Sequence, residues 1–139
     1  MKMNNQQIIT ILNNIADILE IQGIEFKPRA YRRVALAIEV LKENVEDIHA
    51  RGELYGIPGV GNYIGAKLEE MVETGKLKYY DTLKKKLKID VEGLNEIPGL
   101  GPKKIKILYD QLGVKNVKQL EKALRKGKVQ QLEGFAEKT

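Results

Sequence analysis

The hydrophobic positions follow the period of an α-helix almost throughout the chain. Near the N-terminus they recur at spacings of three and four, which is typical of one buried helix face: Ile8, Ile11, Leu12, Ile15, Ile18 and Leu19. Gly23 suits the C-terminal end of this helix. No run alternates polar and apolar residues for long enough to predict a strand. The pattern therefore predicts an all-α protein.

A second helix is expected to begin with Pro28 in its first turn, where proline costs no hydrogen bond. Its apolar face is predicted to contain Tyr31, Val34, Ala35, Ile38 and Leu41. A short helix is expected from Val45 to Ala50, ending at Gly52. These elements predict a small helical bundle.

A short motif occurs twice. Residues 54–61 read L-Y-G-I-P-G-V-G and residues 94–101 read L-N-E-I-P-G-L-G, which are identical at five of eight positions. Each copy leads into a further helical pattern, and these two helices are expected to end at Gly75 and Gly113. A weaker third copy spans residues 127–136. The chain stops at Thr139 before a following helix could form, so we expect a piece of a larger protein.

Each copy holds two glycines around one apolar residue, and the two triplets are Gly59, Val60, Gly61 and Gly99, Leu100, Gly101. Glycine can adopt positive φ and allows a ligand to approach the backbone closely. The proline before each triplet stiffens the turn. Val60 and Leu100 are predicted to point back between the helices. Backbone amides would then face outward and form a phosphate site that the helix dipole favours.

This arrangement resembles the helix-hairpin-helix motif, which reads phosphates rather than bases. Lys103 and Lys104 strengthen the second copy, because they lie in the first helical turn where a phosphate would bind. The dinucleotide-binding fingerprint is excluded, since Ile64 occupies its third glycine position and no strand precedes. The P-loop is excluded because no Gly-Lys-Ser/Thr follows either copy.

Composition narrows the function classes. The 139 residues carry a net charge of +5, and residues 101–139 alone carry ten basic and four acidic groups. That excess suits a phosphate backbone, but on charge alone a solvated lysine-rich helical surface is the favoured interpretation. The absence of Cys excludes a disulfide scaffold, thiolate zinc sites and a cysteine nucleophile. The single His argues against a His-based metal site or a His-containing triad. No apolar run could cross a bilayer, so we expect a cytoplasmic, nucleoid-associated protein with no membrane partner.

Four stretches resemble the N-terminal part of the bacterial and archaeal DNA polymerases of family X. They are P-R-A-Y-R-R-V-A at 28–35, I-P-G-V-G-N-Y-I-G-A-K-L-E-E-M-V-E-T-G-K-L at 57–77, I-P-G-L-G-P-K-K at 97–104 and G-F-A-E-K-T at 134–139. The resemblance implies a lyase-type helix-hairpin-helix domain over residues 1–88 and a truncated fingers-type subdomain over residues 89–139. It implies gapped, nicked or primer–template DNA as partner and no small-molecule substrate.

The resemblance also implies roles for single residues. Lys67 matches the family's Schiff-base lysine, the catalytic residue of 5′-deoxyribose phosphate lyase activity, and Lys27 and Tyr31 match residues that bind the 5′ phosphate. The DNA-binding set would be Lys27, Tyr31, Arg32, Gly59, Val60, Gly61, Gly99, Leu100, Gly101, Lys103 and Lys104. Phe26, Tyr63 and Ala66 depart from the family's repair members, which have histidine, lysine and glutamate there. Alternatively, Lys67 is an exposed helix lysine paired with Glu70.

Cofactors follow from the same resemblance. Backbone carbonyls of each hairpin would hold a monovalent cation, Na⁺ or K⁺, at Tyr55, Ile57 and Val60 and at Asn95, Ile97 and Leu100. No other cofactor is expected in this part. Mg²⁺ is expected only in a palm domain, where paired aspartates hold two ions. The chain has no Asp-x-Asp, so it should not polymerise DNA by itself.

Two further functions stay open. One is a stand-alone, non-catalytic DNA-binding module built from the same hairpins. The other is a base-excision glycosylase, which joins such a hairpin to a lysine and needs an aspartate about twenty residues later. Lys122 lies 18 residues after Lys104, and the only aspartate nearby is Asp110. The glycosylase is therefore the weaker alternative.

Overall fold

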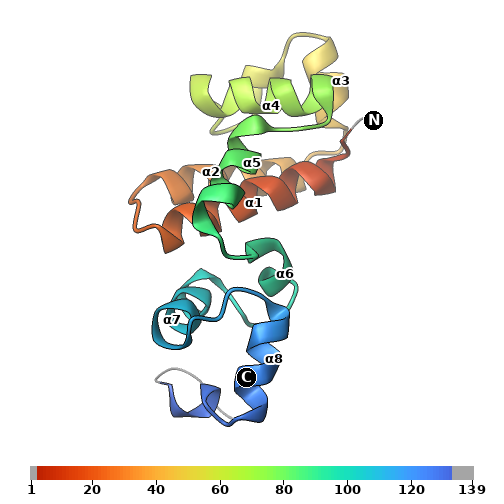
Figure 1. The fold of residues 1–139 in the computed structure, drawn as a ribbon. Helices are drawn as coiled ribbons and strands as arrows, with labels where there is room; N and C mark the ends of the chain where they lie inside the picture. The colour runs from red at the N-terminus through yellow and green to blue at the C-terminus, as the bar shows by residue number, and fades with distance from the viewer. Residues whose placement is uncertain (1–2, 133–139) are drawn as a thin grey trace.

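The structure is a computed structural model, and it describes residues 3–132. In that range the chain forms helices and no strand, which confirms the all-α prediction. The elements in chain order are α1 (Asn5–Ile21), α2 (Lys27–Glu39), α3 (Val45–Ala50), the 3₁₀ helix η1 (Leu54–Gly56), α4 (Asn62–Thr74), α5 (Lys78–Leu87), α6 (Val91–Asn95), α7 (Pro102–Leu112), α8 (Val117–Arg125) and the 3₁₀ helix η2 (Val129–Gln131). In Figure 1, α1 and α2 cross the middle, with α3 and α4 on one side and α6 to α8 on the other.

Local signals explain where the first helices begin and end. Asn4 accepts a hydrogen bond from the Gln7 amide at 2.8 Å, and the Gln7 side chain accepts one from the Asn4 amide at 2.9 Å. This reciprocal capping satisfies two amides that the helix leaves unpaired. Pro28 lies in the first turn of α2, as predicted. One expectation is wrong: α2 ends at Glu39, so Leu41 follows the helix and is only partly buried.

One hydrophobic cluster runs through the described part of the chain. Helix α1 is its centre, because α1 packs against α2, α5, α6 and α7. Leu12, Leu68, Leu94 and Leu108 are completely buried in this cluster, although they come from four different helices. The core therefore continues across residue 88, and the division of the chain at that residue stays a prediction.

A polar junction of Asn14, Asp17, Tyr80, Glu92 and Asn95 crosses the same region. Asn14 donates to the Tyr80 hydroxyl at 3.0 Å and accepts from Asn95 at 3.1 Å. Asn95 also donates to Asp17 at 2.6 Å, and the Tyr80 hydroxyl donates to Glu92. Buried polar groups cost stability unless they are hydrogen-bonded. In the described residues every buried side-chain polar atom has a partner, so the junction joins α1, α5 and α6 without that cost.

We expect Asn14→Leu to lower the free energy of unfolding by about 1–3 kcal/mol, because two buried hydrogen bonds are lost. Asn13→Leu on the same helix is the matched control, because Asn13 is exposed. Urea denaturation of both variants measures the difference. Equal midpoints for the two variants would show that the junction contributes nothing to stability.

Candidate functional site

The two glycines of each hairpin have different conformations. Gly59 and Gly99 have φ values of 87° and 82°, in the left-handed region that favours glycine. Gly61 and Gly101 are extended, with φ of −107° and −98°, and they are the N-cap residues of α4 and α7. The first glycine of each pair is therefore needed for its backbone angle. The second glycine of each pair is the N-cap residue, and because it has no side chain, no side-chain oxygen caps the helix N-terminus.

The amides of the first hairpin are available to a ligand. Gly59, Gly61, Asn62 and Tyr63 are exposed, and their amides donate no hydrogen bond to any residue that the structure describes. The intervening Val60 amide bonds to the Ile57 carbonyl at 3.1 Å, which closes the turn. Free amides at the positive end of a helix form a site for an anion.

The second hairpin repeats this arrangement with one difference. The amides of Gly99, Gly101 and Lys103 have no acceptor in the described part of the chain, and the Leu100 amide bonds to the Ile97 carbonyl at 3.1 Å. Pro102 stands where the first hairpin has Asn62, so the second hairpin has one amide fewer. The exposed side chain of Lys103 adds a positive charge at the same end of α7.

Hydrophobic contacts hold both turns. Leu100 is buried, and Val60 is partly buried against the same core. Both side chains therefore point back into the molecule, as the pattern predicts. This inward anchoring lets the backbone on either side of each residue face solvent.

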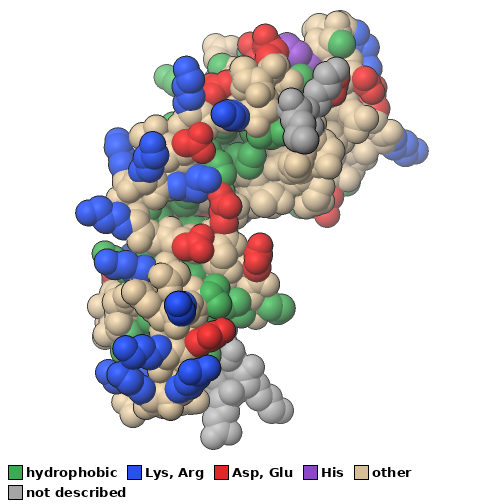
Figure 2. Space-filling view, turned by 45° about the vertical axis from the view of Figure 1, so that its right-hand side comes forward, with side chains coloured by type: hydrophobic (Ala, Val, Ile, Leu, Met, Phe, Trp, Pro, Cys, Tyr) green, Lys and Arg blue, Asp and Glu red, His purple; other side chains and the backbone are tan. Residues whose placement is uncertain are grey.

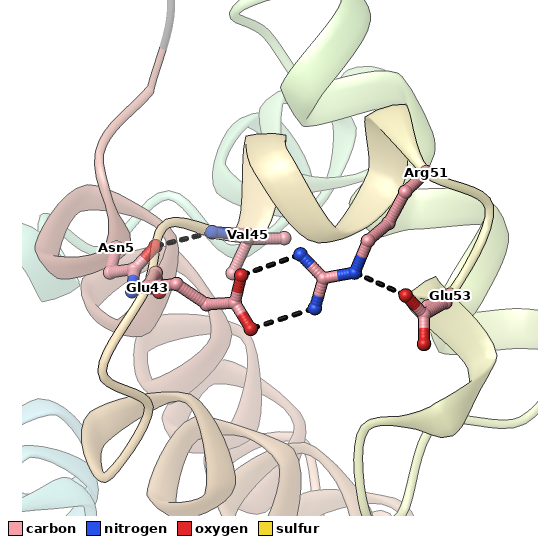
Figure 3. A network of polar contacts seen from close by, with 5 residues as sticks. All are labelled: Asn5, Glu43, Val45, Arg51 and Glu53. Atoms are coloured by element: carbon pink, nitrogen blue, oxygen red, sulfur yellow. Dashed lines mark hydrogen bonds and ion pairs between the residues drawn. The ribbon is translucent and has the colours of Figure 1, made fainter.

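Figure 3 shows the contacts that hold the segment before the first hairpin. Asn5 on α1 accepts a hydrogen bond from the Val45 amide at 2.8 Å and donates to the Glu43 carbonyl at 2.9 Å. Arg51 forms two parallel bonds to the Glu43 carboxylate, at 2.6 and 2.7 Å, and also contacts Glu53. Such paired bonds fix both position and orientation. The bonds of Asn5 connect α1 to the start of α3, the helix that precedes the first hairpin.

A pocket of about 580 Å³ opens beside the first hairpin. It brings together five predicted site residues, Lys27, Tyr31, Gly59, Gly61 and Lys67. The remaining lining residues are Ala30, Asn62, Tyr63, Ile64 and Tyr79. Three aromatic rings, two lysines and the free amides of the turn thus surround one space. None of the described residues that line it carries a carboxylate.

Lys67 is held among aromatic rings. Its Nζ lies 4.5 Å from the ring centroid of Tyr79 and 5.9 Å from that of Tyr63, and it donates a 3.5 Å hydrogen bond to the Tyr63 carbonyl. Burial, followed by the positive charge of Lys27, holds the pKa of Lys67 below its ordinary value, while Glu70 opposes that shift. A lowered pKa increases the neutral, nucleophilic fraction of the amine.

The alternative expectation, an ion pair between Lys67 and Glu70, is not what the structure shows. No pair within 4 Å joins these two described residues; Glu70 instead accepts a hydrogen bond from the Lys78 amide at 2.8 Å. Glu70 therefore holds the start of α5. This leaves the Lys67 amine directed at the pocket rather than at a neighbouring carboxylate.

Tyr79 is a pocket residue to which the sequence analysis assigned no role. The chain reverses at Gly75, and α5 then places Tyr79 against residues from α2 and α4. Burial and a hydrogen bond with Tyr79 raise the pKa of Tyr31, so its phenol stays protonated. In the sequence, Tyr79 and Tyr80 are distinguished only as two adjacent tyrosines at the start of a helix. That pattern does not predict which of the two rings faces the pocket.

Arg32 lies outside the pocket. Its guanidinium donates to Asp17 at 2.7 Å and to Glu20 at 2.9 Å, so both ion pairs tie α2 to α1. Its contact with DNA stays a prediction. Phe26, at the start of α2, is 82% exposed and has a left-handed φ of 70°. The ring therefore stands at the surface next to Lys27.

Among the carbonyl oxygens predicted to hold a monovalent cation, those of Ile57 and Ile97 accept the Val60 and Leu100 amides, and the cation site stays a prediction. Pro58 and Pro98 have no amide, so the carbonyls of Tyr55 and Asn95, three residues earlier, lack the partner that a continuing 3₁₀ turn would supply. Neither carbonyl accepts a backbone hydrogen bond from another element in the described chain. A set of neutral oxygen ligands suits a hard cation.

Clusters of acidic or histidine side chains offer no alternative metal site. Residues 3–132 hold no group of three or more His, Cys, Asp or Glu side chains that could bind a metal ion. In the same range no helix is both long and apolar enough to cross a membrane. The weaker third copy of the motif reaches residue 136, so its end lies outside the described residues.

Two comparisons place the chain among known proteins. The helix-hairpin-helix domain family matches residues 3–77, which is more than half of the chain and includes the first hairpin and Lys67. The DNA polymerase/3'-5' exonuclease PolX of Bacillus subtilis (strain 168) is 32% identical over 138 residues, which is 99% of this chain. The chain spans 24% of the length of that relative. The second hairpin lies beyond the family match but inside this longer alignment.

We expect Lys27→Gln to raise the pKa of Lys67, because removing a nearby positive charge favours the ammonium form. The pKa should remain below the ordinary lysine value, since burial persists. NMR titration of the lysine side chains measures both effects, and Lys42→Gln, an exposed lysine outside the pocket, is the control. An unchanged Lys67 pKa in the Lys27 variant would contradict this electrostatic account.

Proposed function

The chain belongs to the helix-hairpin-helix domain family, and on that premise we propose that it is the DNA-binding N-terminal region of a family X DNA polymerase. The similarity to a DNA polymerase over nearly the whole chain supports this assignment. The observation that carries it is the pair of hairpins in which both glycine amides have no acceptor among residues 3–132. Two such sites on one rigid core suit a repeating anion such as the DNA backbone.

Phosphate oxygens would accept hydrogen bonds from the free amides of each turn. The positive end of α4 or α7 would add a favourable dipole, and Lys103 would contribute a full charge at the second hairpin. Both contacts are to the backbone, so binding would depend little on base sequence. A protein that holds two separated backbone segments is suited to gapped, nicked or primer–template DNA.

The pocket beside the first hairpin would bind the 5′ side of a gap. Lys27 and the Tyr31 hydroxyl would hold the 5′ phosphate, and the neutral Lys67 amine would attack the C1′ aldehyde of an abasic sugar. Loss of water gives an imine, which acidifies C2′. Transfer of the C2′ proton to water then breaks the C3′–O bond, and the electron pair leaves with the 3′ phosphate. Hydrolysis of the imine regenerates Lys67.

A Na⁺ or K⁺ ion would complete each hairpin. The carbonyls of Tyr55, Ile57 and Val60 would hold it in the first, and those of Asn95, Ile97 and Leu100 in the second. Such an ion would place positive charge next to the amides that meet the phosphate. The polymerase activity of a longer protein would require paired carboxylates and Mg²⁺ from another domain.

We expect Gly61→Ser/Gly101→Ser to weaken DNA binding at least about tenfold without lowering thermal stability. Serine is a better N-cap residue than glycine, and its hydroxyl would accept the hydrogen bonds that the free amides otherwise offer to phosphate. Neither glycine has a strained φ, and a Cβ built on either meets no atom within 4 Å. Fluorescence anisotropy and a thermal melt measure the two effects. Undiminished affinity in the folded variant would refute the backbone contact.

We expect borohydride to trap a covalent adduct between the chain and a 5′-incised abasic duplex, and Lys67→Ala to abolish it. Lys42→Ala is the control, because Lys42 lies outside the pocket. Mass spectrometry of the digested adduct would locate the modified lysine. An adduct that persists in the Lys67 variant would assign the chemistry to another amine, and no adduct in the wild-type chain would leave a non-catalytic DNA-binding module.

A further inference from the structure

Helix α8 and its C-cap carry a stripe of basic residues that form no ion pair with any residue in the described chain. Lys118, Lys122, Arg125 and Lys126 recur at intervals of three and four residues. At about 100° per residue these side chains fall within an arc of about 100°. Leu120 and Ala123 are buried on the other side of the helix. Hydrophobic packing therefore fixes the orientation of α8 and turns the basic stripe outward.

Among the described residues of this region, basic side chains far outnumber acidic ones. Residues 111–132 contain six basic residues and one acidic residue, Glu121. None of the six forms an ion pair within 4 Å with a described residue. By contrast, Arg32, Arg51, Lys84 and Lys106 all have carboxylate partners elsewhere in the molecule. The six lie at the end of the molecule that the last turn of α7, α8 and η2 form (Figure 1).

Like charges along one helix face oppose folding. Lys118 and Lys122 are four residues apart, as are Lys122 and Lys126, and like-charge pairs at this spacing destabilise a helix. The helix dipole favours cations only in the last turn, so it does not account for Lys118. An external polyanion would relieve the repulsion along the whole stripe.

A groove continues the stripe toward α7. It has a volume of about 400 Å³ and lies where α7 ends at Gly113. Its lining includes Lys122, Lys126 and Lys128 and, within residues 3–132, no carboxylate. Figure 2 shows Lys and Arg side chains gathered along one edge of the molecule, including the part that α7 and α8 form. The groove and the stripe make one basic surface, the α8 surface.

We propose that the α8 surface binds the phosphate backbone of duplex DNA beyond the segment that the second hairpin contacts. This inference rests on the proposed function and extends it by a third contact. The second hairpin is at the N-terminus of α7 and the groove is at its C-terminus. Eleven residues span about 16 Å. At 3.4 Å per base pair, the α8 surface extends the footprint by up to about five base pairs.

The experiment compares two triple variants of the full 139-residue chain with equal loss of charge. Lys118→Gln/Lys122→Gln/Lys126→Gln removes the stripe. Lys42→Gln/Lys85→Gln/Lys86→Gln removes three exposed lysines from other helices and loops. Affinity for a long duplex is measured from 50 to 200 mM salt. Each phosphate contact contributes roughly 0.9 to the slope of log K against log salt.

The stripe variant should lose about 2–3 units of slope, and the control less than 1. The melting temperature of the stripe variant should equal or exceed that of the wild type, because repulsion among the lysines of α8 is removed. A duplex that is about five base pairs shorter would not reach the α8 surface. On this duplex the affinity of the wild type should fall toward that of the stripe variant. Equal slopes for the two variants, or a stripe variant that matches the wild type, would overturn this inference. A wild-type chain that binds no duplex would instead refute the proposed function.

Discussion

The whole arrangement depends on the polar junction that joins α1 to the second hairpin. Asn95 is the last residue of α6, and its side chain donates to both Asn14 and Asp17 on α1. Two residues later the backbone enters the turn that ends at Gly101. The same Asp17 accepts from Arg32 on α2, the helix that also carries Lys27 and Tyr31 of the pocket. The junction therefore sets the position of the second hairpin relative to the pocket and the first hairpin.

The relative position of the two hairpins matters because a backbone amide cannot move independently of its turn to reach a phosphate. A lysine side chain can swing to reach a phosphate, whereas an amide points where its turn points. Two such sites bind one DNA molecule together only if their separation matches the spacing of its phosphates. Satisfied buried hydrogen bonds are directional and so favour one arrangement over others. A purely apolar contact between α1 and α6 would tolerate sliding more easily.

Repetition and periodicity revealed most of this structure in the sequence. The helices up to Ala50, the helix after each hairpin and the inward direction of Val60 and Leu100 follow from spacing, and the use of glycine in each turn follows from its conformational freedom. The ranges of α5, α6 and α8 were not predicted. The proximity of Lys27, Tyr31 and Lys67 was expected only from a family resemblance. The position of Tyr79 in the pocket and the hydrogen bonds from Asn95 to α1 were not predicted, because each contact joins elements whose register depends on the packing of several helices. Arg32 reads as a free cation in sequence, since its carboxylate partners lie one turn apart on another helix.

The two ends of the molecule handle positive charge differently, and physical chemistry explains the contrast. Around the first hairpin some cations are constrained: Arg32 and Arg51 are paired, and Lys67 is partly buried between Tyr63 and Tyr79. Lys27 and Arg33 are exposed there. The aromatic faces attract the ammonium form, while burial and Lys27 disfavour it. A ligand that fits the pocket would displace water from this amine. The loss of water would favour the neutral amine over the ammonium form. Around α8 the cations are unpaired and exposed, an arrangement suited to a mobile ionic atmosphere and to strong dependence on salt. Selectivity for a particular DNA end would therefore reside at the first hairpin, and general affinity at the second hairpin and α8.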